Sequence, residues 1–200
     1  MMSEQMRIPR QFWKQNPLKK MSAAQISYFS MSIFSIDELN EKMSEIIDPG
    51  ISADRRTVIE EELRQIEILD SGESIIKFMR HEYDIVNRNA LCKKALKMQD
   101  EVMPLVLSRF RTSAQTVFIE TAAMIFAHCD ARYALELREA YPNIRDPYAR
   151  SIASLSLAVQ EDEEAIPLLM QEYERLHRDY PEESYDQGPL LALYRLCGKM

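Results

Sequence analysis

The sequence predicts an all-α protein built from stacked antiparallel helical hairpins, with about ten helices in total. Apolar residues recur at helical spacing along most of the chain, and no convincing alternating strand pattern interrupts them. Only 4 of the 200 residues are glycine, which suits helices because glycine is costly in their interiors. Similar segments also recur roughly every 30 residues, and such a period is typical of stacked helical repeats.

The repeats begin with acidic residues, continue into an amphipathic run, break, and then resume with a second run. Met103, Tyr133 and Ile166 mark the same face of three successive first helices, at steps of 30 and 33 residues. The clearest repeats are assigned to residues 73–98, 100–129, 130–159 and 163–197. Neither helix of such a pair can bury its apolar stripe alone, so neighbouring pairs are expected to stack into one continuous core.

Turn-forming residues separate the two helices of each repeat. The predicted breaks lie at Arg111–Ser113, Pro142–Pro147 and Pro181–Pro189. Asp146 is the expected N-cap of a helix whose first residue is Pro147. Pro104 and Pro167 are both expected near the start of a first helix, where proline removes no needed hydrogen bond.

Two stretches carry a resemblance to a known family. Asp162–Leu169 reads Asp-x-x-Ala-Ile-Pro-Leu-Leu, and Asp100–Val106 reads Asp-Glu-Val-Met-Pro-Leu-Val. At these residues the C-terminal half resembles the HEAT/armadillo-like α-solenoids, particularly short bacterial HEAT-like repeats. The resemblance implies a right-handed α-α superhelix. The chain departs from the family pattern in the inter-helix turn, where Asp146 and Arg150 are only four residues apart. A non-repetitive helical bundle is the alternative architecture.

The chain is expected to form one α-helical repeat domain over residues 22–200, preceded by a basic arm over residues 1–21. Residues 1–20 hold five basic residues and one acidic residue, a net charge of +4. Phe12 and Trp13 lie near the centre of this arm. Two interpretations follow: a terminus whose aromatic side chains pack on the first helices, or an arm that contacts an acidic or membrane surface.

Local signals place the helices that precede the clearest repeats. Ser22–Phe34 is predicted as a helix, although its serine and aromatic content would tolerate a strand. Ser35–Glu38 is predicted to form a capping box for the next helix, which Asp48–Gly50 is expected to end. Ser52 is expected to cap a further helix, and Ser71-Gly72 to end it.

Composition and motifs argue against several classes of protein. A net charge of −7 disfavours general nucleic-acid binding, and no apolar run reaches the length of a membrane span. The three cysteines show neither disulfide nor zinc spacing, which suggests buried thiols in a reducing cytoplasm. No phosphate-binding or nucleophile motif is present, and the single Glu174-x-x-His177 lacks the partners that a di-iron site needs. We therefore expect no catalytic residue, metal or cofactor.

Charge distribution supplies the candidate binding residues. Arg88–Arg111 carries a net charge of +4, and Gln160–Asp186 carries −8. These segments are either two solvated faces or a dipolar surface that orients a protein partner. Solenoids bind partners through successive second helices. The candidates are Arg88, Lys93, Lys97, Glu120 and Arg150, of which the last four are expected to be exposed.

The leading functional hypothesis is a non-catalytic interaction module that binds a protein or peptide. One alternative is a HEAT-like DNA glycosylase of the alkylation-repair type, which would need a basic concave face. A second alternative is a helical-bundle regulator that dimerises through its N-terminal helices.

Overall fold

The computed structural model describes residues 10–15, 53–81 and 85–198, and every regular element within them is a helix. Ten α-helices and two short 3-10 helices lie in these ranges: α1 (Arg10–Gln15), α4 (Ala53–Glu67), α5 (Gly72–Phe78), α6 (Ile85–Lys97), α7 (Gln99–Phe110), α8 (Thr116–His128), α9 (Ala131–Ala140), η2 (Tyr141–Asn143), α10 (Pro147–Val159), η3 (Glu163–Ala165), α11 (Ile166–Asp179) and α12 (Gln187–Leu196). The predicted all-α class is confirmed for this part of the chain.

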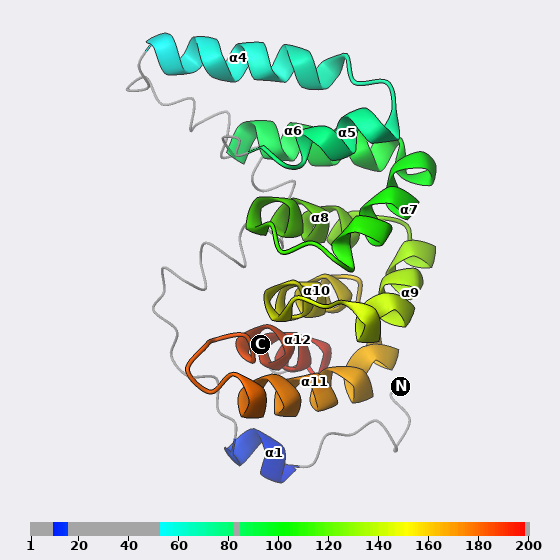
Figure 1. The fold of residues 1–200 in the computed structure, drawn as a ribbon. Coiled ribbons are helices and arrows are strands. Elements are labelled where there is room, and N and C mark those ends of the chain that lie inside the picture. The colour runs from blue at the N-terminus through cyan, green and yellow to red at the C-terminus, as the bar shows by residue number, and fades with distance from the viewer. Residues whose placement is uncertain (1–9, 16–52, 82–84, 199–200) are drawn as a thin grey trace.

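The helices from α5 to α12 form two rows (Figure 1). One row holds the second helices of the predicted repeats, with α6 against α8, α8 against α10, and α10 against α12. In the other row α5 contacts α7, and α7 contacts α9. α4 packs on α6 at one end of the stack, and α11 lies with α12 at the other end (Figure 1). This order places the turns between paired helices along one edge of the stack.

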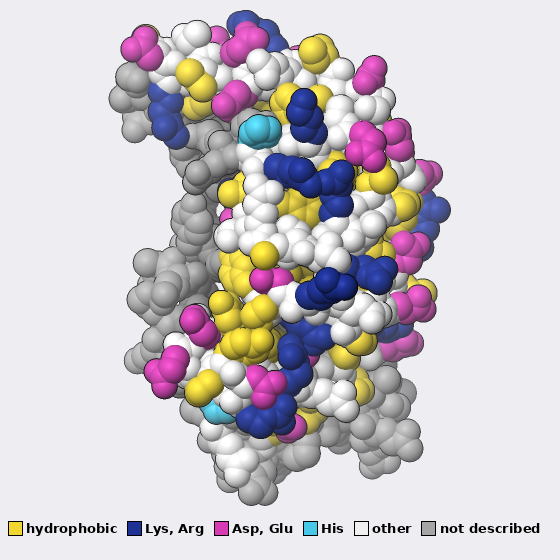
Figure 2. Space-filling view, in the orientation of Figure 1, with side chains coloured by type: hydrophobic (Ala, Val, Ile, Leu, Met, Phe, Trp, Pro, Cys, Tyr) yellow, Lys and Arg dark blue, Asp and Glu magenta, His cyan; other side chains and the backbone are white. Residues whose placement is uncertain are grey.

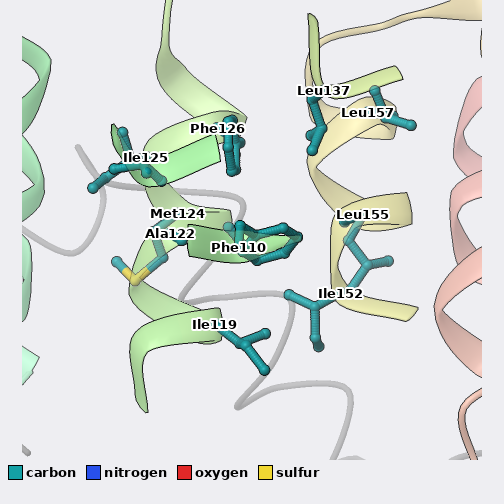
Figure 3. Packing of buried hydrophobic residues seen from close by; sticks show 14 of the residues in the cluster. Phe110, Ile119, Ala122, Met124, Ile125, Phe126, Leu137, Ile152, Leu155 and Leu157 are labelled. Carbon is teal, nitrogen blue, oxygen red and sulfur yellow. The ribbon is translucent and has the colours of Figure 1, made fainter. Parts of the chain in front are cut away.

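The core is centred on α8 and α10. Residues 121–127 of α8 are all buried, as expected for a helix that is apolar on every side. Residues 151–158 of α10 are also all buried, including Leu155, which is 3% exposed. Figure 3 shows Phe110, the last residue of α7, between α8 and α10. Its ring meets that of Phe126 edge to face, with the ring centroids 5.4 Å apart.

Local capping explains where several helices begin. Asp146 is the N-cap of α10, as predicted, and its carboxylate accepts a hydrogen bond of 2.9 Å from the Ala149 amide. Ser71 was expected to end a helix but instead caps α5, because its hydroxyl accepts from the Ser74 amide. The expectation for Pro104 was also wrong: it lies inside α7, whereas Pro167 is the second residue of α11 as predicted.

Only part of the predicted basic arm and of the helices that follow it is described. The predicted helices over residues 22–34 and from Ser35 onward, and the cap at Ser52, lie outside the described residues. Within the arm, α1 is described, and its Phe12 and Trp13 contact the rings of Tyr173 in α11 and Tyr194 in α12. Among the described residues, the α1 part of the arm therefore packs on the last hairpin.

Candidate functional site

Two of the predicted binding residues bind each other. The Arg88 guanidinium of α6 donates to the Glu120 carboxylate of α8 at 3.0 Å. The other oxygen of Glu120 accepts a 2.8 Å hydrogen bond from the Tyr148 hydroxyl of α10. Burial and this hydrogen bond both raise the pKa of Tyr148. The three side chains thus link successive second helices, and Glu120 uses both carboxylate oxygens within the stack.

Arg150 was predicted to be exposed, and the structure corrects this. Its side chain is only 12% exposed and forms an ion pair of 2.7 Å with Glu172 of α11, whose side chain is 5% exposed. Two further hydrogen bonds of 2.7 Å run from Arg150 to the backbone carbonyls of Pro142 and Ile144. Arg175 binds the second oxygen of Glu172 at 2.6 Å. Arg150 therefore joins the α9–α10 turn to the last hairpin.

The two predicted lysines lie on α6. Lys97 is exposed and Lys93 is partly exposed. Their neighbour Lys94 donates a hydrogen bond of 2.9 Å to the Glu67 carbonyl at the end of α4. Of the five candidates, only Lys93 and Lys97 therefore lack a described partner within the fold, and two cations on one helix cannot form an extended surface.

A different row of cations lies along the edge formed by the inter-helix turns. Arg80 follows α5, Arg111 follows α7, and Arg145 precedes α10. All three are exposed, and within the described residues none of these side chains forms an ion pair or hydrogen bond. We call Arg80, Arg111 and Arg145 the turn arginines.

Hydrogen bonds hold the turn arginines in consecutive order. The Gln115 side chain, in the α7–α8 turn, donates to the Arg80 carbonyl at 2.7 Å. The Arg145 amide donates to the Arg111 carbonyl at 3.0 Å. Each bond joins one turn to the next, so the backbones that carry these side chains are fixed relative to one another. Stacked helices lie about 8–10 Å apart, which sets the approximate step along the row.

Tyrosines extend this edge beyond the last turn arginine. Tyr148 lies in the first turn of α10, and its ring is 6.5 Å from that of Tyr185 in the α11–α12 connection. The ring centroids of Tyr185 and Tyr180 are 5.6 Å apart, and all three tyrosines are partly exposed. Figure 2 shows Lys and Arg side chains in a column down the face that carries the turns, with hydrophobic side chains beside it at the level of α10 and α12.

This arrangement suits the recognition of negative charge in an extended ligand. Arginine presents a planar, weakly hydrated fork of donors that matches carboxylates and phosphates. Sequence reasoning did not select these residues, although a signal was available: Arg80, Arg111 and Arg145 are separated by 31 and 34 residues, the period of the repeats. The predicted candidates lie on the faces of helices, whereas this pattern lies in the turns between helices.

Across residues 10–15, 53–81 and 85–198, no group of three or more His, Cys, Asp or Glu side chains is placed to hold a metal ion. No helix in the described part of the chain has the length and apolar character needed to cross a membrane. Comparison of the chain with protein-family models, curated proteins and solved structures found no match.

Proposed function

We propose that the protein is a HEAT-like interaction module that binds an acidic, extended segment of a partner protein along the turn arginines. The observation that carries the proposal is the row itself: one exposed arginine follows or precedes a helix at each of three successive turns, and hydrogen bonds join those turns. The tyrosines at the end of the row offer an apolar contact for the same ligand. Tyrosine and arginine are both enriched where protein interfaces carry their binding energy.

The net charge of the whole chain favours a short acidic peptide over nucleic acid as the ligand. With a net charge of −7, the protein repels a polyanion everywhere except at local basic sites. A short acidic peptide needs only the local site, whereas duplex DNA places phosphates against a broad surface. The buried Cys92 and Cys129 thiols further support the proposal of a cytoplasmic location.

A fluorescein-labelled, glutamate-rich peptide provides the test, with fluorescence anisotropy as the readout. We expect salt-sensitive binding, weakened at least about tenfold, or roughly 1.4 kcal/mol, by the triple change Arg80→Glu, Arg111→Glu, Arg145→Glu. A matched control changes Arg55, Arg56 and Arg64 of α4 to Glu, which alters net charge equally on an exposed helix away from the turns. The control variant should bind like the wild type, and circular dichroism should show equal helix content in both.

A second comparison separates this surface from the one predicted on the second helices. Lys93→Glu with Lys97→Glu should leave peptide affinity within about twofold, since these side chains lie on α6 and outside the row. Loss of binding in the Lys93/Lys97 variant would contradict the proposal. An equal loss of binding in the α4 control and in the turn-arginine variant would also contradict it. Tight binding of duplex DNA in place of the peptide would instead support the glycosylase-like alternative.

A further inference from the structure

Described elements pack on three of the four sides of α10. On the α8 side, the Ser156 hydroxyl donates to a backbone carbonyl of α8 at 2.9 Å. On the α12 side, Ser151 lies against Gly188. On the α9 side, the hydroxyls of Ser154 and Tyr141 are hydrogen-bonded at 2.7 Å, and Tyr141 begins the short helix that follows α9. The fourth side of α10 faces away from α9 and lies between α8 and α12.

Apolar side chains form a stripe along this fourth side. Tyr148, Ile152, Leu155 and Val159 are spaced by four, three and four residues, which places them on one face of the helix. We call these four residues the inner stripe. Ile152 and Leu155 are each only 3% exposed, although the helices that pack most extensively on α10 lie on its other three sides. Tyr185 contacts the stripe only at Tyr148, about two turns before Leu155, so the middle of the stripe requires a cover from another part of the chain.

The same dry surface continues on α8. Glu120 lies on the side of α8 that adjoins the inner stripe, because it accepts hydrogen bonds from Tyr148 of α10 and Arg88 of α6. Met124 and Ala127 follow Glu120 by four and seven residues and therefore share its face. These two side chains are only 1% and 4% exposed. The covered surface thus crosses two successive second helices of the stack.

The chain has to pass from one end of the stack to the other. α1 ends at Gln15 and packs on α11 and α12, whereas α4 begins at Ala53 and packs on α6 at the opposite end (Figure 1). Four steps between stacked second helices, of about 8–10 Å each, separate α12 from α4. Residues 16–52, which join the two ends, would cover about 55 Å even as a continuous helix. This connection is therefore long enough to follow the whole row of second helices.

The composition of the connection suits an apolar surface. Residues 21–36 contain no Asp, Glu, Lys or Arg, and no other run in the sequence is as long without one of these charges. The predicted helix over Ser22–Phe34 places Ile26, Phe29 and Ile33 on one face. Apolar side chains of this size are stabilised by transfer from water to an apolar contact. The uncharged segment and the inner stripe therefore match in chemistry.

We propose that residues 22–34 dock in cis across the fourth side of α8 and α10, with Ile26, Phe29 and Ile33 against the inner stripe. The chain then returns along the second helices from α12 to α4. The segment occupies the face that successive second helices of a solenoid offer to a partner, which leaves the edge with the turns for binding. This docking does not depend on whether the turn arginines bind a ligand.

Leu155 and Leu157 provide matched reporters on opposite sides of α10. Leu157 follows Ser154 by three residues, so it lies on the α9 side, and it is fully buried. Hydroxyl-radical footprinting of the full chain, read by tandem mass spectrometry, should modify both leucines slowly. Ile26→Ser/Phe29→Ser should raise modification of Leu155 at least about fivefold and leave Leu157 within about twofold. As the control, Ala24→Ser/Ser27→Asn alters the opposite side of the predicted helix and should change neither leucine.

A second measurement keeps the segment apolar. The photocrosslinking analogue p-benzoylphenylalanine replaces Phe29, and we expect adducts to peptides of α8 and α10 within one molecule, in a yield that does not change with protein concentration. The proposal is overturned if Leu155 is modified equally in the wild type and in the Ile26/Phe29 variant. Adducts only to other helices, or only between two copies, also overturn it. If both leucines become reactive together, the variant has opened the whole fold, and the crosslinked peptides decide the outcome.

Discussion

Glu172 is the most consequential single charge in the described fold. It lies buried between the guanidinium groups of Arg150 and Arg175. Glu172→Ala leaves Arg150 largely buried without its counter-ion, and removal of one partner of such a pair costs about 3–5 kcal/mol. We expect urea denaturation to show a fall of this size in the free energy of unfolding. Glu174→Ala, an exposed position on the same helix, is the control and should change stability by less than about 0.5 kcal/mol. Equal effects of the two changes would contradict this role for Glu172.

The three cysteines differ in burial, and their thiols are therefore expected to differ in reactivity. Burial raises the pKa of the Cys92 thiol to about 12, and burial likewise raises the pKa of Cys129 to about 12. The thiolate is the reactive form, so both should be alkylated slowly in the native protein. Cys197 is partly exposed and should react first with iodoacetamide. Peptide mass spectrometry after brief labelling measures the order, and labelling of Cys92 as fast as Cys197 would show that the core opens readily.

At the scale of single residues, the sequence predicts which side chains are buried but not which charged side chains form pairs. The burial of Leu155 follows directly from its place on an apolar helical stripe. Arg150 could not be placed in the same way, because the carboxylate that holds it lies 22 residues away on another helix. Periodicity identifies which face a residue occupies, but not which charged side chain meets it from the next element.

At the scale of the helices, α12 approaches α10 closely at Gly188. A Cβ atom at Gly188 would lie 2.1 Å from the Ser151 carbonyl oxygen and 2.4 Å from the Ser151 hydroxyl. Gly188→Ala must therefore push α12 away from α10, and we expect a loss of about 2–3 kcal/mol in thermal unfolding. Gly198→Ala meets no neighbour but has a φ of +60°, so it should cost only about 1 kcal/mol. An unchanged melting temperature for Gly188→Ala would mean that the two helices are farther apart than described.

Helices and turns were not equally predictable. The four late hairpins begin and end close to the positions that apolar spacing, Asp146 and the proline-rich breaks indicate. Ser71 was misassigned because a Ser-Gly pair suits either end of a helix, and only the hydrogen bond to Ser74 distinguishes them. The spacing of the turn arginines is visible in the sequence, but nothing in the turn sequence shows that hydrogen bonds join successive turns.

For the whole molecule, the two rows of helices predict how stability divides among the hairpins. Truncation after Gln160 removes α11 and α12 and exposes the side of α10 that packs on α12. In a stack of repeats each unit depends mainly on its neighbours, so the truncated chain should retain much of its helical circular dichroism while it self-associates. In a bundle with one shared core, the same truncation would abolish the helical signal. That outcome would remove the basis for an extended row of turns.

In the proposed binding mode, successive turns present one arginine each, in a row with a regular step. Extended peptides rise about 3.3 Å per residue, so three residues cover about 10 Å, the spacing of stacked helices. The direct measurement compares two labelled peptides of identical composition: one carries glutamate at every third position, and the other carries its glutamates in one contiguous block. We expect the spaced peptide to bind about fivefold more tightly, with the preference lost in the triple variant of Arg80, Arg111 and Arg145. Equal affinities for the two peptides, or a preference that survives in the triple variant, would contradict the account.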